Sequence, residues 1–254
     1  MSWKKNIVVL YVAISVLGAS LLARADDDQA ARETVQRIAS LLVAKSSIAT
    51  ITMQILNDDG QHDLSMKVWS AGGQDVLFRI LTPKAEANTA VLKIGDDVWY
   101  YLPKTNRTVK VPSAMTMNKW MGSDFTVDDL VKENFLARDY NISNSFHGDR
   151  SGVAVDEYTL TPKSDAVVVY GKIVLQVRRD NQMPAWQRYY DEDGKLVREL
   201  TFSDYKVMGG RLIPTRLLMR PMEKTGAQTT IVYDDISFDA VITDGTFAVN
   251  NLPR

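Results

Sequence analysis

Strict alternation of apolar and polar residues, the pattern of a half-buried β-strand, recurs along most of this chain. It begins at Ile51, Met53 and Ile55, and it resumes over Leu64–Val68 after the turn residues Asn57–Gly60. Alternation of this kind places one set of side chains in a core and the other set in solvent. The two segments therefore predict a β-hairpin.

The same period continues to the end of the chain, with tight turns predicted at Asp193–Gly194 and Gly209–Gly210. About ten or eleven strands are expected, at the spacing of an antiparallel sandwich or barrel. Ten of them are the two hairpin strands and the segments Val76–Ile80, Thr89–Ile94, Ala154–Thr161, Lys172–Arg179, Ala185–Tyr190, Leu196–Lys206, Arg211–Arg220 and Thr229–Phe238, and Gly95–Pro112 also contributes to the sheet.

The first 25 residues have the composition of a secretory signal peptide. Trp3–Lys5 provides a basic start, Ile7–Leu22 is an apolar run, and Ala23–Ala25 is a small-residue cleavage pattern. A membrane-spanning helix needs about 20 apolar residues, and this run is shorter and contains a serine and a glycine. We therefore expect cleavage near Ala25 and export to the periplasm.

The charge balance of the mature chain gives no sign of a polyanionic partner. Removing Lys4, Lys5 and Arg24 from the 30 basic residues leaves 27 against 31 acidic residues, a net charge of −4. These charges form no basic stripe, which argues against nucleic acid as a ligand. The sequence contains no cysteine, so disulfides and a lipid-modified cysteine are excluded.

Residues Asp26–Lys45 are predicted to form a helix that lies over the sheet. Acidic residues begin it, Lys45 ends it, and Ala31, Val35, Ile38 and Leu42 share one side. Asn134–Gly152 has no clear period and is predicted to be a long connection. Since no linker-like segment or repeat divides the chain, residues 26–254 are expected to form one domain.

The sequence shows no catalytic or metal-binding motif. His62 and His147 have no partner at metal-ligand spacing, and neither H-E-x-x-H nor G-x-S-x-G occurs. The acidic clusters Asp58–Gly60 and Asp191–Gly194 lack the ligand series of an EF-hand and suit turns better. A Ser/His/Asp arrangement assembled from distant segments stays an open alternative. We expect a protein that is not an enzyme and that has no cofactor or metal site.

The stretch Leu92–Leu130 passes from strand to helix and is rich in Met and Trp. A helix is predicted over Ser113–Met121, with Ser113 as N-cap and with Met117, Trp120 and Met121 on one side. Methionine is flexible and polarisable, so this side suits contact with varied apolar ligands. Ordinary core packing explains the same side equally well.

A second short helix is predicted to begin at Thr126. The hydroxyl of Thr126 is placed to cap it together with Asp129 three residues on, while Phe125 and Leu130 form a hydrophobic staple. The two helical pieces interrupt a chain that is otherwise made of strands. They are therefore expected to form a lid over an apolar cavity.

Several segments of the chain resemble a known family. They are Gly95–Pro103 (G-D-D-V-W-Y-Y-L-P), Arg107–Pro112 and Met121–Leu130 (M-G-S-D-F-T-V-D-D-L), followed by Tyr170–Ile173, Asp191–Leu196 and Gly210–Arg216. Together they resemble the outer-membrane lipoprotein-sorting protein family, the LolA-like superfamily of periplasmic lipid and lipoprotein carriers.

The resemblance implies a mainly β fold, in which an antiparallel sheet curls into a half-open barrel and helices cover its concave face. It also implies an apolar cavity for lipid acyl chains or a lipoprotein, transient membrane contact, and an inner-membrane transporter as partner. With inward faces assigned from the alternation, the residues expected to line the cavity and lid are Met53, Ile55, Met66, Val68, Phe78, Ile80, Trp99, Tyr101, Met117, Trp120 and Met121.

Two other functions stay open at this stage. The first is a regulatory or interaction module of the periplasm, RseB-like, whose cavity senses lipid while its sheet contacts a partner protein. The second is a hydrolase acting on lipids, which needs a nucleophile that the sequence does not identify. The carrier interpretation is the one that the strand pattern, the predicted leader and the resemblance share.

Overall fold

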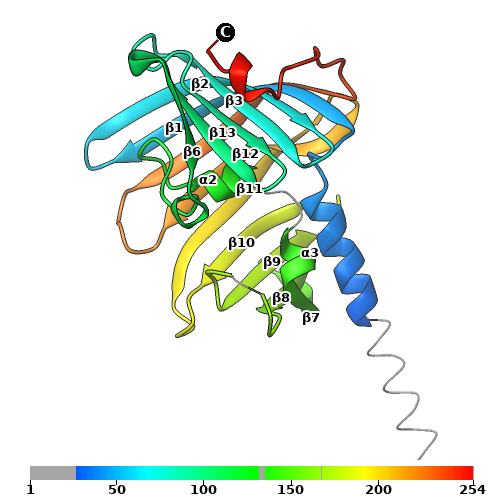
Figure 1. Ribbon diagram of the computed structural model, residues 1–254. Coiled ribbons are helices and arrows are strands. Elements are labelled where there is room, and N and C mark those ends of the chain that lie inside the picture. The colour runs from blue at the N-terminus through cyan, green and yellow to red at the C-terminus, as the bar shows by residue number, and fades with distance from the viewer. Residues whose placement is uncertain (1–26, 132–134, 167, 254) are drawn as a thin grey trace, which may run out of the picture.

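The computed structural model of this chain describes residues 27–131, 135–166 and 168–253. The predicted signal peptide lies outside the described residues. Within them, the strands form one antiparallel sheet of 13 strands in the order β6-β5-β4-β3-β2-β1-β13-β12-β11-β10-β9-β8-β7. The sheet curls strongly without closing, as Figure 1 shows. The predicted fold, a half-open antiparallel barrel, is confirmed.

Except for β7, the strands keep nearly the boundaries that the alternation predicts, and their number in the described residues is 13 rather than ten or eleven. They are β1 Ser46–Asn57, β2 Gly60–Ala71, β3 Asp75–Thr82, β4 Ala90–Ile94, β5 Asp97–Leu102, β6 Arg107–Val111, β7 Tyr140–Arg150, β8 Val153–Pro162, β9 Lys172–Arg178, β10 Pro184–Tyr190, β11 Leu196–Met208, β12 Arg211–Pro221 and β13 Gln228–Phe238. Sequence neighbours pair as hairpins, and the long-range pair β1–β13 joins the two halves of the sheet.

The prediction of a long connection over Asn134–Gly152 is wrong. This segment contains a short helix, α3 (Phe135–Asp139), and the edge strand β7. β7 pairs along its length with β8 and carries a bulge between Asn144 and Phe146. Because β7 is an edge strand, most of its side chains are exposed, so its sequence is polar and lacks the alternation of a half-buried strand.

Helices cover the concave face of the curled sheet (Figure 1). The helix over residues 27–39 buries Ala31, Val35 and Ile38 in the main core, as predicted, but it ends earlier than expected. The Ser40 hydroxyl bonds back to the Gln36 carbonyl oxygen at 2.9 Å, and irregular turns follow. The helices α2 (Val127–Val131) and α3 are shorter and lie over the same face.

The convex face of the sheet carries a second, smaller core. Leu77, Leu92 and Tyr101 are buried there with Leu252 from the C-terminal segment. The Arg79 guanidinium donates a hydrogen bond to the Leu252 carbonyl oxygen at 3.0 Å, which fixes that segment over β3 to β5. The strands of this half are therefore covered on both faces. None of the helices in the described part of the chain combines the length and apolar character needed to cross a membrane.

Candidate functional site

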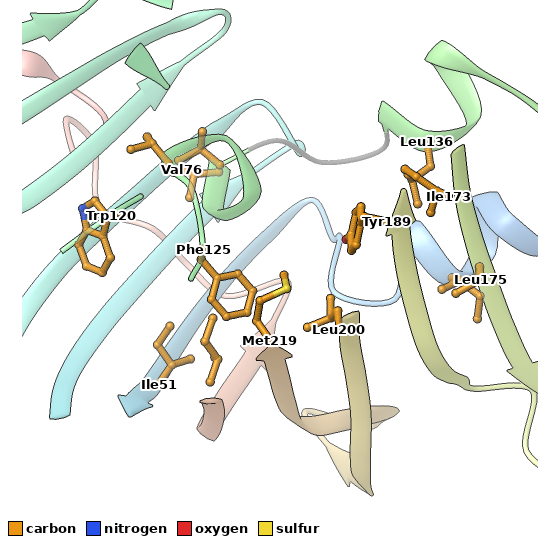
Figure 2. Packing of buried hydrophobic residues seen from close by; sticks show 14 of the residues in the cluster. Ile51, Val76, Trp120, Phe125, Leu136, Ile173, Leu175, Tyr189, Leu200 and Met219 are labelled. Atoms are coloured by element: carbon orange, nitrogen blue, oxygen red, sulfur yellow. The ribbon is translucent and has the colours of Figure 1, made fainter. Parts of the chain in front are cut away.

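A cavity of about 260 Å³ lies on the concave face, between the sheet and its helices. Figure 2 shows part of this core, in which Met219 lies between Phe125 and Leu200. The wall is mostly apolar. Its lining residues come from the end of the first helix and the turn after it, from Phe125, α2 and α3, and from seven strands, β1 to β3 and β10 to β13: Ala39, Leu42, Val43, Ser47, Ala49, Ile51, Val68, Ser70, Val76, Phe78, Phe125, Asp129, Leu130, Leu136, Gln187, Tyr189, Leu200, Leu217, Met219, Ile231, Tyr233 and Ile236.

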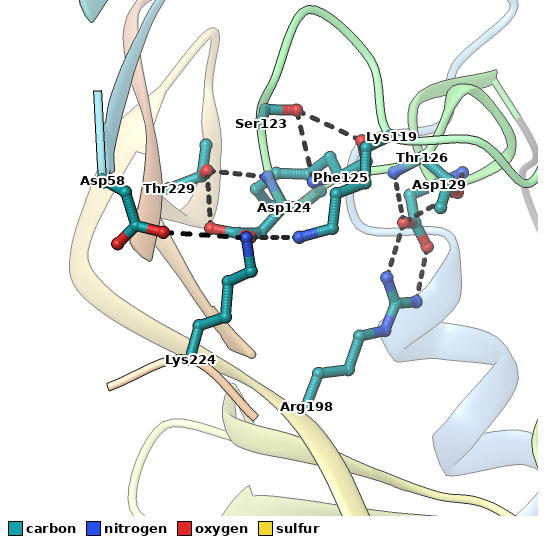
Figure 3. Close-up of polar contacts among 10 residues, drawn as sticks. All are labelled: Asp58, Lys119, Ser123, Asp124, Phe125, Thr126, Asp129, Arg198, Lys224 and Thr229. Carbon is teal, nitrogen blue, oxygen red and sulfur yellow. Dashed lines mark hydrogen bonds and ion pairs between the residues drawn. The ribbon is translucent and has the colours of Figure 1, made fainter. Parts of the chain in front are cut away.

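An ion pair ties α2 to the sheet at the border of this cavity (Figure 3). Both terminal nitrogens of Arg198 on β11 donate to the Asp129 carboxylate at 2.7 Å, a bidentate geometry. The side chains are only 9% and 15% exposed. The guanidinium also lies over the rings of Tyr170 and Tyr189, at 4.8 Å and 4.2 Å from their centroids.

The ion pair sets the protonation of both partners. Burial alone would raise the pKa of Asp129, but the hydrogen bonds and charge of Arg198, together with hydrogen bonds from Thr126, outweigh it and lower that pKa. For Arg198, burial acts to lower the pKa, and Asp129 reverses this and raises it. Both groups are therefore charged at neutral pH, and each neutralises the other.

Asp129 also fixes the start of α2, as the sequence predicts. The Thr126 backbone N–H and hydroxyl donate to Asp129 Oδ2 at 2.8 and 2.9 Å, and the Asp129 N–H donates to Thr126 Oγ1 at 3.0 Å. This reciprocal arrangement is a capping box with Asp in place of Glu. One carboxylate thus both caps the short helix and holds it to β11.

The predicted helix over Ser113–Met121 is wrong. The structure has one 3₁₀ turn at Ser113–Met115, followed by an irregular loop. The loop backbone bonds to the segment that follows it: the Trp120 N–H donates to the Phe125 carbonyl oxygen at 2.9 Å, and the Asp128 N–H donates to the Thr116 carbonyl oxygen at 2.9 Å. These bonds replace the i→i−4 bonds of a helix.

Polar anchors hold this loop on the sheet (Figure 3). The Asp124 N–H donates to Thr229 Oγ1 on β13 at 2.8 Å, and that hydroxyl donates to Asp124 Oδ2 at 3.0 Å. Lys119 Nζ donates to Asp124 Oδ1 at 2.8 Å. Met121 and Gly122 have positive φ values of 52° and 76°, which form the tight turn. The hydrogen bonds between Asp124 and Thr229 hold the loop against β13.

The structure separates the predicted lining residues into several groups. Val68 and Phe78 line the cavity. Buried in the same concave core, but outside the cavity lining, are Met53, Ile55, Met66, Ile80 and Trp120. Met121 is partly buried against that core, whereas Met117 is half-buried and outside it. In Figure 2, Trp120 lies on the far side of Phe125 from Tyr189.

The prediction that Trp99 and Tyr101 face the concave side of the sheet is wrong. Both contribute to the convex core beneath the C-terminal segment, while Val98 and Tyr100 of the same strand face the main core. All four residues are apolar or aromatic because β5 is covered on both faces. Alternation does not distinguish the two faces of such a strand, and a shift by one residue exchanges them.

Of the 22 residues that line the cavity, only Val68 and Phe78 were predicted from the sequence. Gln187, Tyr189, Leu200 and Met219 come from β10, β11 and β12. Each stands at an inward position of a strand that the alternation does identify. The alternation does not predict the curvature of the sheet, and this curvature is what brings these strands to face β1 to β3 across the cavity. The sequence contains one signal that identifies this side of the cavity. Arg198 stands two residues before Leu200 in a predicted strand, on the same face, and Asp129 lies in the predicted helix that begins at Thr126.

The two histidines each pair with a carboxylate. His62 Nε2 lies 3.0 Å from Glu86, and His147 Nδ1 lies 2.6 Å from Asp156. Both side chains are exposed, at 41% and 61%. Among the described residues, no group of three or more His, Cys, Asp or Glu side chains is placed to hold a metal ion.

Comparisons with known proteins agree with this architecture. A family model described as that of an uncharacterized protein matches residues 72–254. A search of curated proteins finds no match. Among solved structures, a domain from Vibrio parahaemolyticus named for outer membrane lipoprotein sorting is 25% identical, with a TM-score of 0.76, and the alignment covers 89% of this chain and 100% of that one.

Two further crystal structures share the fold. A DUF1329 family protein from Desulfovibrio piger is 21% identical with a TM-score of 0.79, over 89% of this chain and 99% of that one. A LolA superfamily protein from Nitrosomonas europaea is 20% identical with a TM-score of 0.71, over 85% of this chain and 96% of that one. The resemblance expected from the sequence is thereby confirmed.

Proposed function

We propose that this chain carries lipid acyl chains in its concave cavity. The chain belongs to the family of uncharacterized proteins whose model matches residues 72–254, and it has the fold of the LolA superfamily. The proposed setting is the periplasm, after removal of the leader near Ala25. The cargo is a lipid or a lipoprotein, received from a membrane transporter through transient membrane contact. The role is binding and transfer rather than catalysis.

The apolar cavity on the concave face is the observation that carries this proposal. Its volume is about 260 Å³, and most of its wall is aliphatic or aromatic. An apolar cavity of about 150 Å³ in another protein stays dry and binds benzene, so this one has room for a larger apolar group. Each buried methylene contributes about 0.8 kcal/mol, which lets a hydrocarbon chain be held without a hydrogen bond.

The short helix α2 supplies a way to exchange such a cargo. Two of its residues, Asp129 and Leu130, line the cavity, and α2 has only five residues. Its attachment to the sheet runs through the Asp129–Arg198 pair. Moving α2 would widen the cavity for a longer chain, so the exchange rate depends on how firmly that pair holds.

A cavity-filling substitution tests the proposal. Leu217 lines the cavity from β12, so Leu217→Trp should place an indole in the space proposed for the acyl chain. We expect binding of a fluorescent fatty-acyl probe to weaken at least about tenfold, since about two buried methylenes correspond to that factor. The measurement is a fluorescence titration of each purified protein.

The matched control is the next residue on the same strand. Leu218 projects to the convex face of the sheet, so Leu218→Trp adds the same indole outside the cavity. It should bind the probe like the unmodified protein. Equal probe affinities in both variants, or no binding by the unmodified protein, would argue against an acyl chain in this cavity.

A further inference from the structure

The polar side chains of the cavity wall differ in whether the protein itself satisfies them. Six polar residues line it: Ser47, Ser70, Asp129, Gln187, Tyr189 and Tyr233. The hydroxyls of Ser47 and Ser70 bond to each other at 3.0 Å. Asp129 accepts from Arg198 and Thr126, and Tyr233 has an interaction of its own.

Gln187 and Tyr189 differ from the others. They stand at adjacent inward positions of β10 and are only 5% and 4% exposed. No residue in the described parts of the chain hydrogen-bonds to the Gln187 carboxamide or to the Tyr189 hydroxyl, although the Tyr189 ring contacts Arg198. Among the described residues, the fully buried polar atoms without a partner are Trp120 Nε1 and Arg198 Nε, so the polar ends of Gln187 and Tyr189 are in contact with the space of the cavity. Two such groups side by side can therefore bond to a polar group of a ligand in the cavity.

The charges around this pair restrict that group to a neutral one. The Arg198 guanidinium is bound to Asp129 through both terminal nitrogens, its Nε is buried without a hydrogen-bond partner, and Arg198 is not among the residues that line the cavity. Arg198 is therefore not available to a ligand carboxylate, and the described cavity lining contains no lysine, arginine or histidine. Burial raises the pKa of Tyr189, so its hydroxyl remains a donor. A carboxamide N–H and a phenol O–H suit a carbonyl oxygen.

We propose that Gln187 and Tyr189 form a polar subsite that binds the carbonyl group of a neutral acyl ester, with the acyl chain along the apolar wall formed by Leu200, Met219 and Ile231. This inference rests on the proposed function and specifies its ligand class. The cargo is an ester-linked acyl chain, as in an acylglycerol or in the lipid group of a lipoprotein, and not a free fatty acid. Ligands without a carbonyl leave the two groups unpaired.

Three probes with the same ten-carbon chain test the subsite by competition with a fluorescent acyl probe at pH 7.5. They are methyl decanoate, decanoate and decane, which share the apolar chain and differ at its end. We expect methyl decanoate to bind at least about tenfold more tightly than decanoate. In Gln187→Leu and in Tyr189→Phe, affinity for methyl decanoate relative to decane should fall about tenfold, because a hydrogen bond in a desolvated site is lost.

Ser70→Ala is the matched control, since Ser70 lines the same cavity but its hydroxyl already has a partner. It should leave the ester-to-decane ratio unchanged. Retained binding of decane by each variant shows that the cavity is intact. If decane binds and the ratio is the same in all proteins, water satisfies the two groups and the subsite is refuted while the carrier function stands. If the unmodified protein binds neither decane nor the ester, both proposals fail.

Discussion

Arg198→Ala should lower the free energy of unfolding by about 3–5 kcal/mol, because it leaves the Asp129 carboxylate buried without its partner. The carboxylate accepts two hydrogen bonds from Arg198 and is only 15% exposed. Asp129 also caps α2, so the loss should loosen the helix that borders the cavity. Chemical denaturation of the purified variant measures the change.

A second ion pair on the convex side of the same strands is the control. Arg188 Nε donates to Glu199 at 2.6 Å, but the Arg188 side chain is 38% exposed. Exposed pairs contribute about 0–1 kcal/mol, so Arg188→Ala should have a small effect. Similar losses in Arg188→Ala and Arg198→Ala would contradict the assignment of Arg198 as the attachment point of α2.

The same pair predicts a dependence of stability on pH. The pKa of Asp129 is lower in the folded protein than in the unfolded chain, where it is about 3.9. Its contribution is therefore present above about pH 4 and is lost as the pH falls through the lower folded pKa. Arg198→Ala removes the main cause of that shift. Stability of this variant should consequently fall less steeply below pH 4 than that of the unmodified protein.

Trp120→Ala should also lower the free energy of unfolding by about 3–5 kcal/mol, the range for removal of a large buried aromatic side chain. Trp120 is 1% exposed and belongs to the main core, where the anchored loop places it. It does not line the cavity, so probe affinity in the folded variant should change much less than stability. Denaturation and probe titration on the same sample separate the two effects.

Trp186→Ala is the comparison for this substitution. Trp186 is half-buried on the convex face of β10, with the Arg188 guanidinium 4.1 Å from its ring centroid. Loss of such a contact costs about 0.5–1 kcal/mol. If Trp120→Ala instead leaves stability near that of the unmodified protein but abolishes probe binding, Trp120 is part of a ligand-facing lid, contrary to its buried position.

The sequence predicts the sheet well because alternation is a local signal. Ile51 and Met53 on β1 and Ala31 and Val35 on the first helix are buried as their spacing requires. The edge strand β7 was missed since an exposed strand has no apolar face to reveal it. The helix predicted at Ser113–Met121 was wrong because non-local backbone bonds to Phe125 and α2 replaced the helical ones.

The cavity is harder to predict since it arises from the curvature of the sheet. Val68 and Phe78 on one side and Leu200 and Met219 on the other are far apart in sequence. Each has the pattern of an ordinary core residue. None of the Met and Trp residues in Leu92–Leu130 lines the cavity: Trp120 is buried in the main core, Met121 and Trp99 are partly buried against a core, and Met115 is exposed. The position of the cavity depends instead on where α2 is capped and held, at Thr126, Asp129 and Arg198.

Native mass spectrometry, with lipid extraction, of the protein purified from the periplasm under mild conditions tests whether the cavity carries an acyl chain. We expect a population carrying one additional mass that corresponds to an acyl lipid, and loss of that mass in Leu217→Trp but not in Leu218→Trp. A protein that is always free of lipid, even after incubation with acyl esters, would contradict it.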